Sequence, residues 1–525
     1  MPSIAAFFFI ALPWLNPFSS GPSPSIVPLL FAWACAAALL GVCSLGSGRV
    51  LAGHFVRTMA TAWLLAALLS AVLGLLQYFG ATAVLVPWVN STGIGEAFAN
   101  LRQRNQFATL TNIGLAALLW WVAESQATPT SSGAAARSAL HNWRPGVSVA
   151  AAVLLAVGNA AASSRTGLVQ LGLLMGMAWV WGGWRQADIR RVLLAAALAY
   201  WVAAFALPLL VDLDPHATGI LARLNDGGPA CASRLTLWGN VLHLIAQKPG
   251  LGWGWGELDY AHFITLYPGA RFCDILDNAH NLPLHLAVEL GVPTALLICG
   301  GGLWLGWRAK PWREFDASRR MAWAVLALIL LHSMLEYPLW YGPFQMAFGL
   351  CLWLLWRSPE RSSGAGSVPR SARRTSAPTS AKAGSFGLPD NYLYALIAMF
   401  LIVIAACAAW DYHRISQLYL VPKMRSEAYR DNTLEKLRDS WLFQNQVRFA
   451  ELGTTPLTTG NAAHIKELAT ALLHFSPEPR VIEKLIESAV LLGFEEEALF
   501  YLVRYRAAFP ESHARWAKEN AQSKT

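Results

Sequence analysis

RTMATAWLLAALLSAVLGLLQYF, residues 57–79, is the stretch that decides the fold. After Arg57 it contains no charged residue, and about 20 consecutive apolar residues are what a helix needs to cross the hydrocarbon core of a bilayer. Ten further segments have the same character: 3–17, 26–46, 106–123, 146–162, 166–184, 192–211, 282–307, 321–337, 343–357 and 391–410. The sequence therefore predicts an all-α polytopic membrane protein with about eleven transmembrane helices.

The composition agrees with many membrane spans. The 525 residues are 55% hydrophobic and only 14% charged, whereas a soluble protein carries about 25% charged residues. The 24 Trp residues fit this class, because Trp gathers where the apolar core meets the lipid headgroups. The net charge of +9 could suggest nucleic-acid binding. That reading fails because the charges lie in short loops between apolar runs rather than in one basic patch.

The loops alternate in charge, which predicts the orientation of the chain. Basic residues fill every second loop: Arg49 and Arg57; Arg137 and Arg144; Arg185, Arg190 and Arg191; Arg308, Lys310, Arg313, Arg319 and Arg320; Arg357, Arg361, Arg370, Arg373, Arg374 and Lys382. The positive-inside rule assigns these loops to the cytoplasm. With eleven spans, the N-terminus is then inside and the C-terminus outside. The first segment lacks a basic region and a small-residue cleavage site, so we expect a retained helix rather than a cleaved signal.

Four regions follow from this layout. Residues 1–357 are expected to form a transmembrane domain, the catalytic one if the polar groups described below are active, with a long outer (periplasmic) loop, 212–281, before the eighth span. Residues 358–390, rich in Ser, Ala, Gly and Pro, are expected to be a flexible cytoplasmic linker. Residues 391–410 form the last span. Residues 411–525 are charged and helix-forming, and are expected to be a small periplasmic α-helical domain.

The stretch PEPRVIEKLIESAVLLGFEEEALFYLVRYRAAFP in this last region resembles a tetratricopeptide helix pair. Apolar residues recur at helical spacing, and Gly493 marks the turn. Two roles remain open for the domain at this point. It caps and stabilises the membrane part, or it grips an acceptor protein, because repeat stacks offer concave binding surfaces.

Several basic residues break the charge rule by lying on the outer side. Arg104 and Arg165 each lie at the lip of a span among small and polar neighbours. An ionisable group at membrane depth usually faces an interior cavity and marks function, and the planar guanidinium suits phosphate. Arg234 lies in the long loop. Arg223, Lys248 and Arg271 lie there too, and surface ion pairs with the carboxylates of that loop are their simpler interpretation.

Two clusters hold the candidate acid–base groups. In DNAHNLPLHLAVELGVP, His280 stands just before the eighth apolar run, beside Asn278 and Asn281, while His285 and Glu289 are four residues apart on one helical face. In LLHSMLEYPLWYGP, His332, Glu336 and Tyr337 lie at the outer end of the ninth span, and His332 and Glu336 are also four apart. At the entrance of a poorly hydrated cavity, the pKa of such side chains can lie near neutral pH. A His–Glu pair can equally serve only to hold helices together.

The remaining motifs exclude some chemistry. KPGLGWGWGELDY has the glycines of a phosphate loop but no G-x-x-x-x-G-K-[ST] pattern, so we interpret it as a Gly/Trp turn lining the mouth of the site. No C-x-x-C or Cys/His spacing is present, and neither a metal nor a cofactor is expected. Cys231 and Cys273 share the long outer loop, which predicts that they form a disulfide in an oxidising compartment.

Five of these motifs, in this order, resemble the O-antigen ligase and polymerase superfamily, and within it the PglL-type protein O-oligosaccharyltransferases. They are RQRNQFATL, SSRTGL, SRLTLWGNVLHLIAQKPGLGWGWGEL, AHNLPLHLAVELGVP and HSMLEYPLWYGPFQMAFGL, which together span roughly half of the chain. The resemblance implies that His280 is the essential periplasmic histidine. It also implies that Arg104, Arg165 and Arg234 hold the diphosphate of the donor.

The same resemblance implies a reaction. The donor would be an oligosaccharide on undecaprenyl diphosphate at a Gram-negative inner membrane, and arginines would stabilise the departing diphosphate. His280 would orient or deprotonate the acceptor hydroxyl; Glu289 and Glu336 would assist, supported by Asn281, His332 and Tyr337.

The acceptor stays open among three enzymes. Ser or Thr of a pilin-like periplasmic protein is the first choice; a growing glycan (polymerase) and lipid A–core (ligase) are the alternatives. A polysaccharide flippase is a fourth reading, but a transporter is expected to place charges at the midplane, whereas this chain gathers its polar groups at one face.

Overall fold

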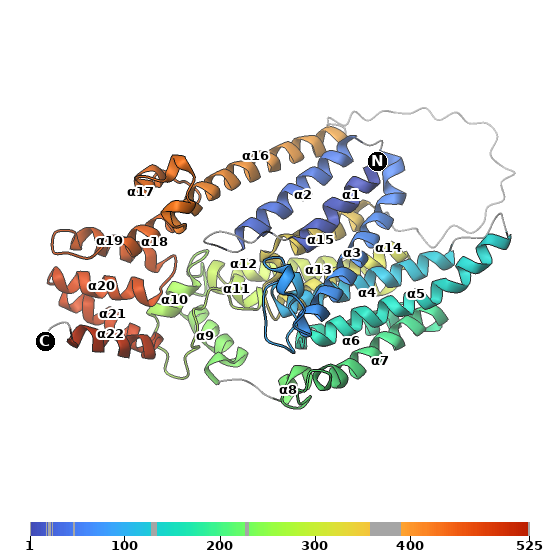
Figure 1. The fold of residues 1–525 in the computed structure, drawn as a ribbon, viewed down its shortest axis with the longest axis horizontal. Helices are drawn as coiled ribbons and strands as arrows, with labels where there is room; N and C mark the ends of the chain where they lie inside the picture. The colour runs from blue at the N-terminus through green and yellow to red at the C-terminus, as the bar shows by residue number, and fades with distance from the viewer. Residues whose placement is uncertain are drawn as a thin grey trace.

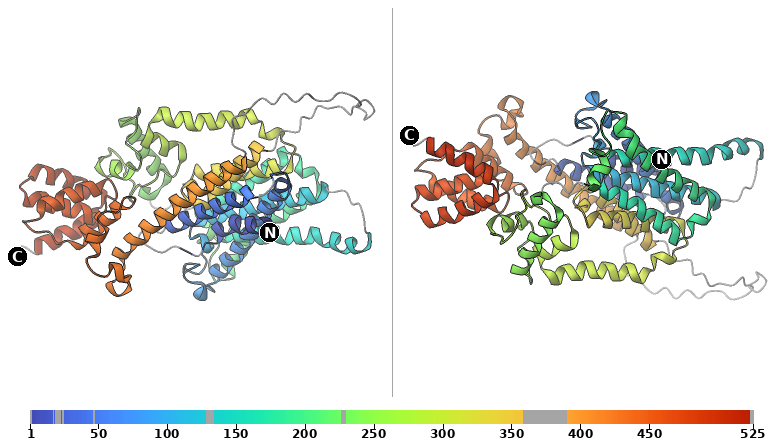
Figure 2. Two further views of the ribbon diagram at one scale, coloured as in Figure 1. Left: turned by 90° about the horizontal axis from the view of Figure 1, so that it is seen from above. Right: turned by 90° about the horizontal axis from the view of Figure 1, so that it is seen from below.

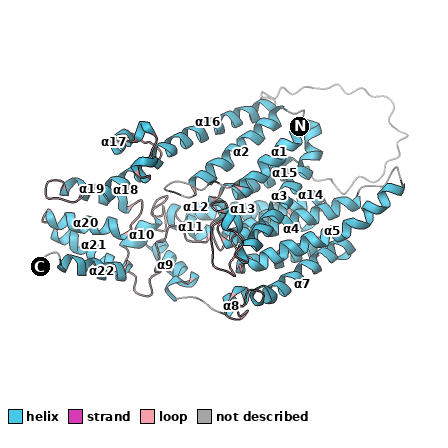
Figure 3. Cartoon of the chain, viewed as in Figure 1, coloured by secondary structure: helices cyan, strands magenta, loops and turns pink. Residues whose placement is uncertain are grey.

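The protein is described by a computed structural model, which places residues 2–522 except 17, 19–22, 24, 46–47, 128–133, 226–229 and 358–389. Over these residues the chain is helical and contains no strand (Figure 3). Nearly all of the predicted linker 358–390 therefore lies outside the described residues.

Ten long helices form a bundle (Figure 1). They are α1 (Pro2–Ala11), α2 (Ile26–Leu45), α3 (Gly48–Tyr78), α4 (Arg104–Ala127), α5 (Ala134–Ala161), α6 (Arg165–Val180), α7 (Ala187–Leu209), α14 (Ala317–Ser333), α15 (Gly342–Arg357) and α16 (Asp390–Ser416). Five stretches are long and apolar enough to cross a membrane: Ile26–Leu45, His54–Tyr78, Arg104–Gln126, Ala187–Leu209 and Tyr392–Tyr419. Shorter apolar helices lie at Ser3–Leu15, Pro145–Ala161 and Gly342–Trp356. The chain is thus a multi-pass membrane protein, while the count of eleven spans and their orientation stay predictions.

Helix α4 lies at the centre of the bundle. It packs against α3, α5, α6 and α14, and Phe107, Leu110 and Ile113 are fully buried along it. Gly114 lets α3 approach closely, because a Cβ at that position would collide with the Cβ of Ala67. Arg104, the first residue of α4, is consequently held at one end of the most enclosed helix in the bundle.

The eighth predicted span is not one continuous helix. Helix α11 (Leu282–Leu290) ends at Gly291, whose φ of +87° favours glycine. The chain then continues through α12 (Val292–Ala295), a π-helical turn at Leu296–Gly300 and α13 (Gly301–Ala309). Figure 2 shows this second part set apart from the bundle. Ala295 of α12 is buried against α11, but most side chains beyond it are exposed: Leu297 is 76% exposed and Trp307 72%.

The long loop before this break folds into a small unit of its own. It contains α9 (Arg234–Gln247) and α10 (Leu258–Ile264), with a core of Leu237, Val241, Leu244, Leu258, Ala261, Phe272, Leu276, Ala279 and Val288. The first helix of the loop, α8 (Gly219–Asn225), packs instead against α5, α6 and α7 of the bundle. Cys231 and Cys273 are bonded, with their Cα atoms 5.3 Å apart. The predicted disulfide is therefore confirmed, and it ties the chain just before α9 to the segment that leads to His280.

The Gly/Trp turn, residues 249–257, packs against the far end of α11. The N–H of Trp253 donates to the carbonyl of Val288 (2.8 Å), and that of Gly254 to Glu289 (3.0 Å). Such close contact of two backbones requires glycine, because a Cβ on Gly252 would collide with the Glu289 carbonyl. The prediction that this turn lines the mouth of the site is wrong: none of its residues borders the large cavity described below.

The C-terminal region is helical, as its sequence indicated, and it begins after α16 ends at Ser416. It comprises α17 (Thr433–Leu437), α18 (Gln444–Thr454), α19 (Ala462–Leu473), α20 (Pro479–Leu491), α21 (Glu495–Ala508) and α22 (Pro510–Gln522). Gly493 has a φ of +78° between α20 and α21, as its predicted place in the turn requires. Figure 1 shows this domain and the unit of α9, α10 and α11 at the same end of the bundle.

Helix α10 joins these two units. Its inner residues Leu258 and Ala261 lie in the core of the loop unit, whereas Phe263 is buried in the core of the helical domain. Arg504 of α21 donates to the carbonyl of Ile264 (2.7 Å), and His474 stacks on Tyr260 with ring centroids 3.8 Å apart. The helical domain is therefore fastened to the loop unit that carries the candidate site.

Candidate active site

Polar residues from the bundle and the loop unit surround a cavity of about 820 Å³. Its walls include all three arginines singled out from the sequence, together with His280 and Glu336. The cavity lies where the first turns of several helices meet, at the end of the bundle that carries the loop unit. The structure thus gathers in one place residues that are separated by more than 200 positions in the chain.

Each of the three arginines is the first residue of a helix: Arg104 begins α4, Arg165 begins α6 and Arg234 begins α9. The residue before each one caps the helix. Gln103 accepts from the N–H of Gln106 (2.6 Å), Ser164 from that of Gly167 (3.0 Å), and Ser233 from that of Thr236 (3.1 Å). Three helix N-termini with their partial positive charge consequently reinforce three guanidinium groups around one cavity.

Arg223 joins this group, although the sequence favoured a surface ion pair for it. It lines the same cavity and donates to the carbonyl of Ser163 (2.9 Å). Burial, followed by the nearby charges of Arg104 and Arg165, lowers the pKa of Arg223 to about 10. No motif in the sequence marks Arg223, and the fold alone brings it to the other arginines.

Lys248 and Arg271 also lack the expected ion pairs in the described part of the chain. Arg271 instead donates to the carbonyls of Thr265 and His262, and Lys248 lies over the ring of Trp253. Both residues hold the loop unit together rather than line the cavity.

His280 is fixed by the asparagines on either side of it. Asn278 accepts a hydrogen bond from the N–H of His280 (2.9 Å). Asn281 caps α11 by accepting from Leu284 (3.1 Å) and donates to the carbonyl of Met334 (3.1 Å). His280 itself has a φ of +48°, a conformation that a residue with a side chain adopts at a cost. This turn presents the imidazole to the cavity wall.

Glu336 is the partner of His280. Its Oε2 lies 2.6 Å from His280 Nδ1, while its Oε1 accepts from Arg234 Nη2 and from Asn105 Nδ2 (3.1 Å). Asn105 in turn accepts from the hydroxyl of Ser164 (2.7 Å). The carboxylate therefore connects the histidine to two of the three helix starts, and Asn105 is a site residue that the sequence reading did not single out.

His332 and Glu336 border one small cavity, but no direct hydrogen bond or ion pair joins their side chains in the described structure. Helix α14 ends at Ser333, so Glu336 lies beyond it in a turn whose N–H donates to the His332 carbonyl (2.8 Å). His332 binds Thr109 instead (2.9 Å). Tyr337 packs edge-on against His280, with ring centroids 5.0 Å apart.

Glu289, a further catalytic candidate, does not reach the cavity. It is buried on α11 beside His285 (3.5 Å), as the four-residue spacing predicted. Trp255 and Trp340 cover this pair: each packs edge-on against His285, and the two indoles are nearly parallel. Glu289 therefore belongs to the packing between α11 and the Gly/Trp turn.

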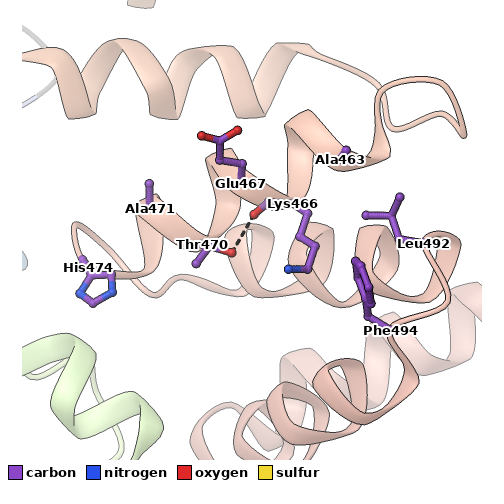
Figure 4. Close-up of a pocket in the computed structure, with 8 residues that line it drawn as sticks. All are labelled: Ala463, Lys466, Glu467, Thr470, Ala471, His474, Leu492 and Phe494. Atoms are coloured by element: carbon purple, nitrogen blue, oxygen red, sulfur yellow. Dashed lines mark hydrogen bonds between the residues drawn. The ribbon is translucent and has the colours of Figure 1, made fainter.

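A second cavity, of about 610 Å³, lies on the helical domain (Figure 4). It follows one face of α19, from Ala463 to His474, and is closed by Leu492 and Phe494. Lys466 lies over the ring of Phe494 in this groove. His474, at its end nearest α10, is hydrogen-bonded to Glu257 of the Gly/Trp turn (2.6 Å).

Comparison with known proteins agrees with this site. The family model described as "O-Antigen ligase" matches residues 150–299, "Protein glycosylation ligase" matches 97–122, and "Virulence factor membrane-bound polymerase, C-terminal" matches 320–524. Each segment contributes to the cavity: Arg104 lies in the second, Arg165, Arg234 and His280 in the first, and Glu336 in the third. The chain is thus similar to the O-antigen ligases in these segments, and the matches support a glycosyltransferase-type enzyme.

Within that class the chain is similar to the PglL-type O-oligosaccharyltransferases. A "General O-oligosaccharyltransferase" of Acinetobacter baylyi is 27% identical over 326 residues, which cover 59% of this chain and 52% of that protein. A "ComP-specific O-oligosaccharyltransferase" of the same organism is 26% identical over 262 residues, covering 49% and 43%. The chain thus spans about half the length of the curated relatives it matches. No solved structure matches it.

Proposed function

We propose that the protein is an O-oligosaccharyltransferase that moves a glycan from undecaprenyl diphosphate to a Ser or Thr side chain of a periplasmic, pilin-like protein. The observation that carries the proposal is the cavity in which Arg104, Arg165, Arg223 and Arg234 gather beside the His280–Glu336 pair. A cavity of about 820 Å³ has room for a diphosphate and the first sugar of a glycan. Its multiple fixed cations suit an anion that carries more than one negative charge.

The chemistry assigns a role to each group. The acceptor oxygen bonds to the anomeric carbon while the bond from that carbon to the diphosphate oxygen breaks. Negative charge grows on the diphosphate, where the arginines and the N-termini of α4 and α6 stabilise it without having to move. The reacting proton passes from the acceptor hydroxyl to His280 Nε2, because Nδ1 is occupied by Glu336. Glu336 then stabilises the imidazolium that forms.

A protein acceptor is favoured over the other two by the curated relatives, both of which are named as O-oligosaccharyltransferases. The groove on α19 adds a surface outside the bundle on which an acceptor protein could rest. In this proposal the cavity faces the periplasm across the inner membrane, in agreement with the disulfide between Cys231 and Cys273. A growing glycan and lipid A–core are the alternative acceptors.

The test is reconstitution of the purified protein with a lipid-linked oligosaccharide and three acceptors: a pilin-type protein, a lipid-linked glycan and lipid A–core. We expect sugar on the protein. His280→Ala should slow this transfer by about 10²–10⁴-fold, the usual contribution of a general base. His216→Ala is the matched control, because His216 is an exposed histidine of the same loop that does not border the cavity. Sugar on either other acceptor would replace the proposal, and normal transfer by His280→Ala would remove His280 from the mechanism.

A further inference from the structure

His332 is a fully enclosed histidine that the mechanism above does not use. It is 1% exposed and lies near the end of α14, and its Nδ1 is 2.9 Å from Thr109 Oγ1 of α4. Its second ring nitrogen, Nε2, is buried and has no hydrogen-bond partner among the described residues. An unsatisfied polar atom inside a membrane bundle is costly, so this nitrogen needs an explanation.

The contacts of Thr109 determine which nitrogen of His332 carries the proton. The Thr109 hydroxyl lies 2.8 Å from the carbonyl of Asn105 and 3.1 Å from Oε1 of Gln170, and both of these are acceptors. The orientation of the Gln170 amide is fixed because its Nε2 donates to the Leu328 carbonyl (2.9 Å). An acceptor oxygen at 2.8 Å favours placing the single hydroxyl proton between it and Thr109, so we assign Thr109 as the acceptor from His332. A neutral His332 consequently carries its proton on Nδ1, and Nε2 is an acceptor.

Glu336 supplies a second unfilled acceptor next to it. A carboxylate offers about four lone-pair sites, of which Arg234 and Asn105 fill two on Oε1 and His280 fills one on Oε2. One site on Oε2 is left. His332 and Glu336 both border a small enclosed cavity of about 10 Å³, whose other walls are Gln103, Gln106, Tyr337, Pro338 and Tyr341. That is about the space one water molecule needs.

We propose that a single water molecule binds in this cavity and donates one hydrogen bond to His332 Nε2 and the other to Glu336. Two acceptors that share one small cavity need a donor between them, and a water molecule has two protons to give. The Tyr341 hydroxyl borders the same cavity and accepts hydrogen bonds from Tyr337 and Gln106, so its own proton is left to donate to the water oxygen. His332 is then a positioning residue for His280, acting through the water and Glu336.

The water molecule would fill the last free hydrogen-bonding site of the Glu336 carboxylate. With it, Glu336 is held by α4, by α9, by the turn that carries His280 and, through the water, by α14. A carboxylate filled at all four sites cannot rotate away when His280 becomes charged. The catalytic part of this inference rests on the proposed function, whereas the binding of the water does not.

A pair of amide substitutions separates this role from simple packing. The amide of His332→Asn reaches about as far as Nδ1, so it can keep the contact with Thr109 but cannot reach the cavity. The amide of His332→Gln reaches about as far as Nε2, so it can bind the water while giving up Thr109. We expect His332→Gln to stay near the wild-type kcat for transfer and His332→Asn to lose about tenfold, the effect of one supporting hydrogen bond, with the donor KM unchanged in both. The opposite order, with Asn active and Gln impaired, would show that the contact with Thr109 is what matters and overturn the proposal.

A high-resolution experimental structure of the full-length protein tests the water without any assay. Density within about 2.6–3.2 Å of both His332 Nε2 and a Glu336 oxygen is the expected result. A direct bond from a protein donor such as Tyr341 to Nε2, with no density between His332 and Glu336, would refute the water. Loss of transfer in the wild-type protein with that density present would count against the proposed function alone.

Discussion

Glu336 is the residue at which the contacts of the candidate site converge, since it binds His280, Arg234 and Asn105 together. Glu336→Gln keeps the size of the side chain and removes its charge. We expect transfer to fall by at least about 10²-fold, because loss of the carboxylate that orients a catalytic imidazole costs about 10⁴-fold in a Ser-His-Asp triad. The measurement is the initial rate of glycan transfer at saturating donor.

Glu289→Gln is the matched control for that variant. Glu289 is a buried glutamate of the same region, but it faces His285 rather than the cavity. Its variant should retain a rate within a few-fold of wild type. An equal loss in both variants would mean that the effect comes from packing around α11 and not from the orientation of His280.

Asp259 gives the loop unit a pH-dependent stability. Burial raises the pKa of this carboxyl to about 7 from its ordinary value of 3.8, and the nearby Glu257 and Asp277 act in the same direction. The folded state therefore binds the proton more tightly than the unfolded state, so stability is greatest below about pH 4 and falls as the pH rises towards 7. Asp259→Asn should raise the unfolding temperature at pH 8 and leave it nearly unchanged at pH 4. Tryptophan fluorescence during heating at the two pH values measures this, and an equal shift at both would contradict the assignment.

At the level of elements, the contact between α11 and the Gly/Trp turn depends on Gly291. A Cβ there would meet the carbonyl of Gly250, and its φ of +87° is strained for any other residue. We expect Gly291→Ala to destabilise the protein by about 1–3 kcal/mol from backbone strain alone, and to slow transfer because α11 begins directly after His280. Gly300→Ala is the control, since a Cβ at that helical position meets nothing within 4 Å. Comparable behaviour of the two variants in thermal unfolding would show that the close contact is not required.

The positions of the helices could be predicted because hydropathy depends only on residues that are neighbours in the chain. All eleven apolar segments are largely helical, and the helix pair around Gly493 lies where its spacing placed it. The eighth segment was predicted as one helix because apolar residues dominate it on both sides of the break. The sequence Gly-Val-Pro at 291–293 could have indicated the break, because glycine commonly follows the end of a helix and proline commonly lies in the first turn of the next one.

The site could be predicted only in part. Arg104, Arg165 and Arg234 stand out because they oppose the charge rule, and His280 because it lies among asparagines. The partners of these residues did not stand out: Glu336 binds His280 across 56 positions, and Arg223 reaches Ser163 across 60. These contacts join residues that are far apart in the chain, so no local pattern in the sequence indicates them. The four-residue spacing pointed to His332 as the neighbour of Glu336 instead of His280.

For the whole molecule, Phe263 is the side chain that fastens the helical domain to the loop unit. It comes from α10 but is 2% exposed within the core formed by α19, α20 and α21. Phe263→Ala should cost about 3–5 kcal/mol and release the domain, which limited proteolysis between residues 416 and 433 would detect. Leu499→Ala is the control, because Leu499 is 59% exposed on α21. Unchanged proteolysis in Phe263→Ala would show that the domain is held by other contacts.

We expect the rate of transfer to depend on the thickness of the bilayer, because the exposed helix α13 is joined through α12 and α11 to the candidate site. Val292–Ala309 spans about 27 Å at 1.5 Å per residue, close to the roughly 30 Å of a hydrocarbon core, and α13 buries no side chain against the bundle. We therefore expect the tilt of α13 to respond to the lipid, whereas α12 packs against α11 through Ala295. Since Gly291 connects it to α11, thin and thick membranes should pull differently on the turn that holds His280. The protein should be reconstituted in lipids of increasing acyl-chain length. We expect the rate of glycan transfer to be highest at one acyl-chain length and to fall in thinner and thicker bilayers.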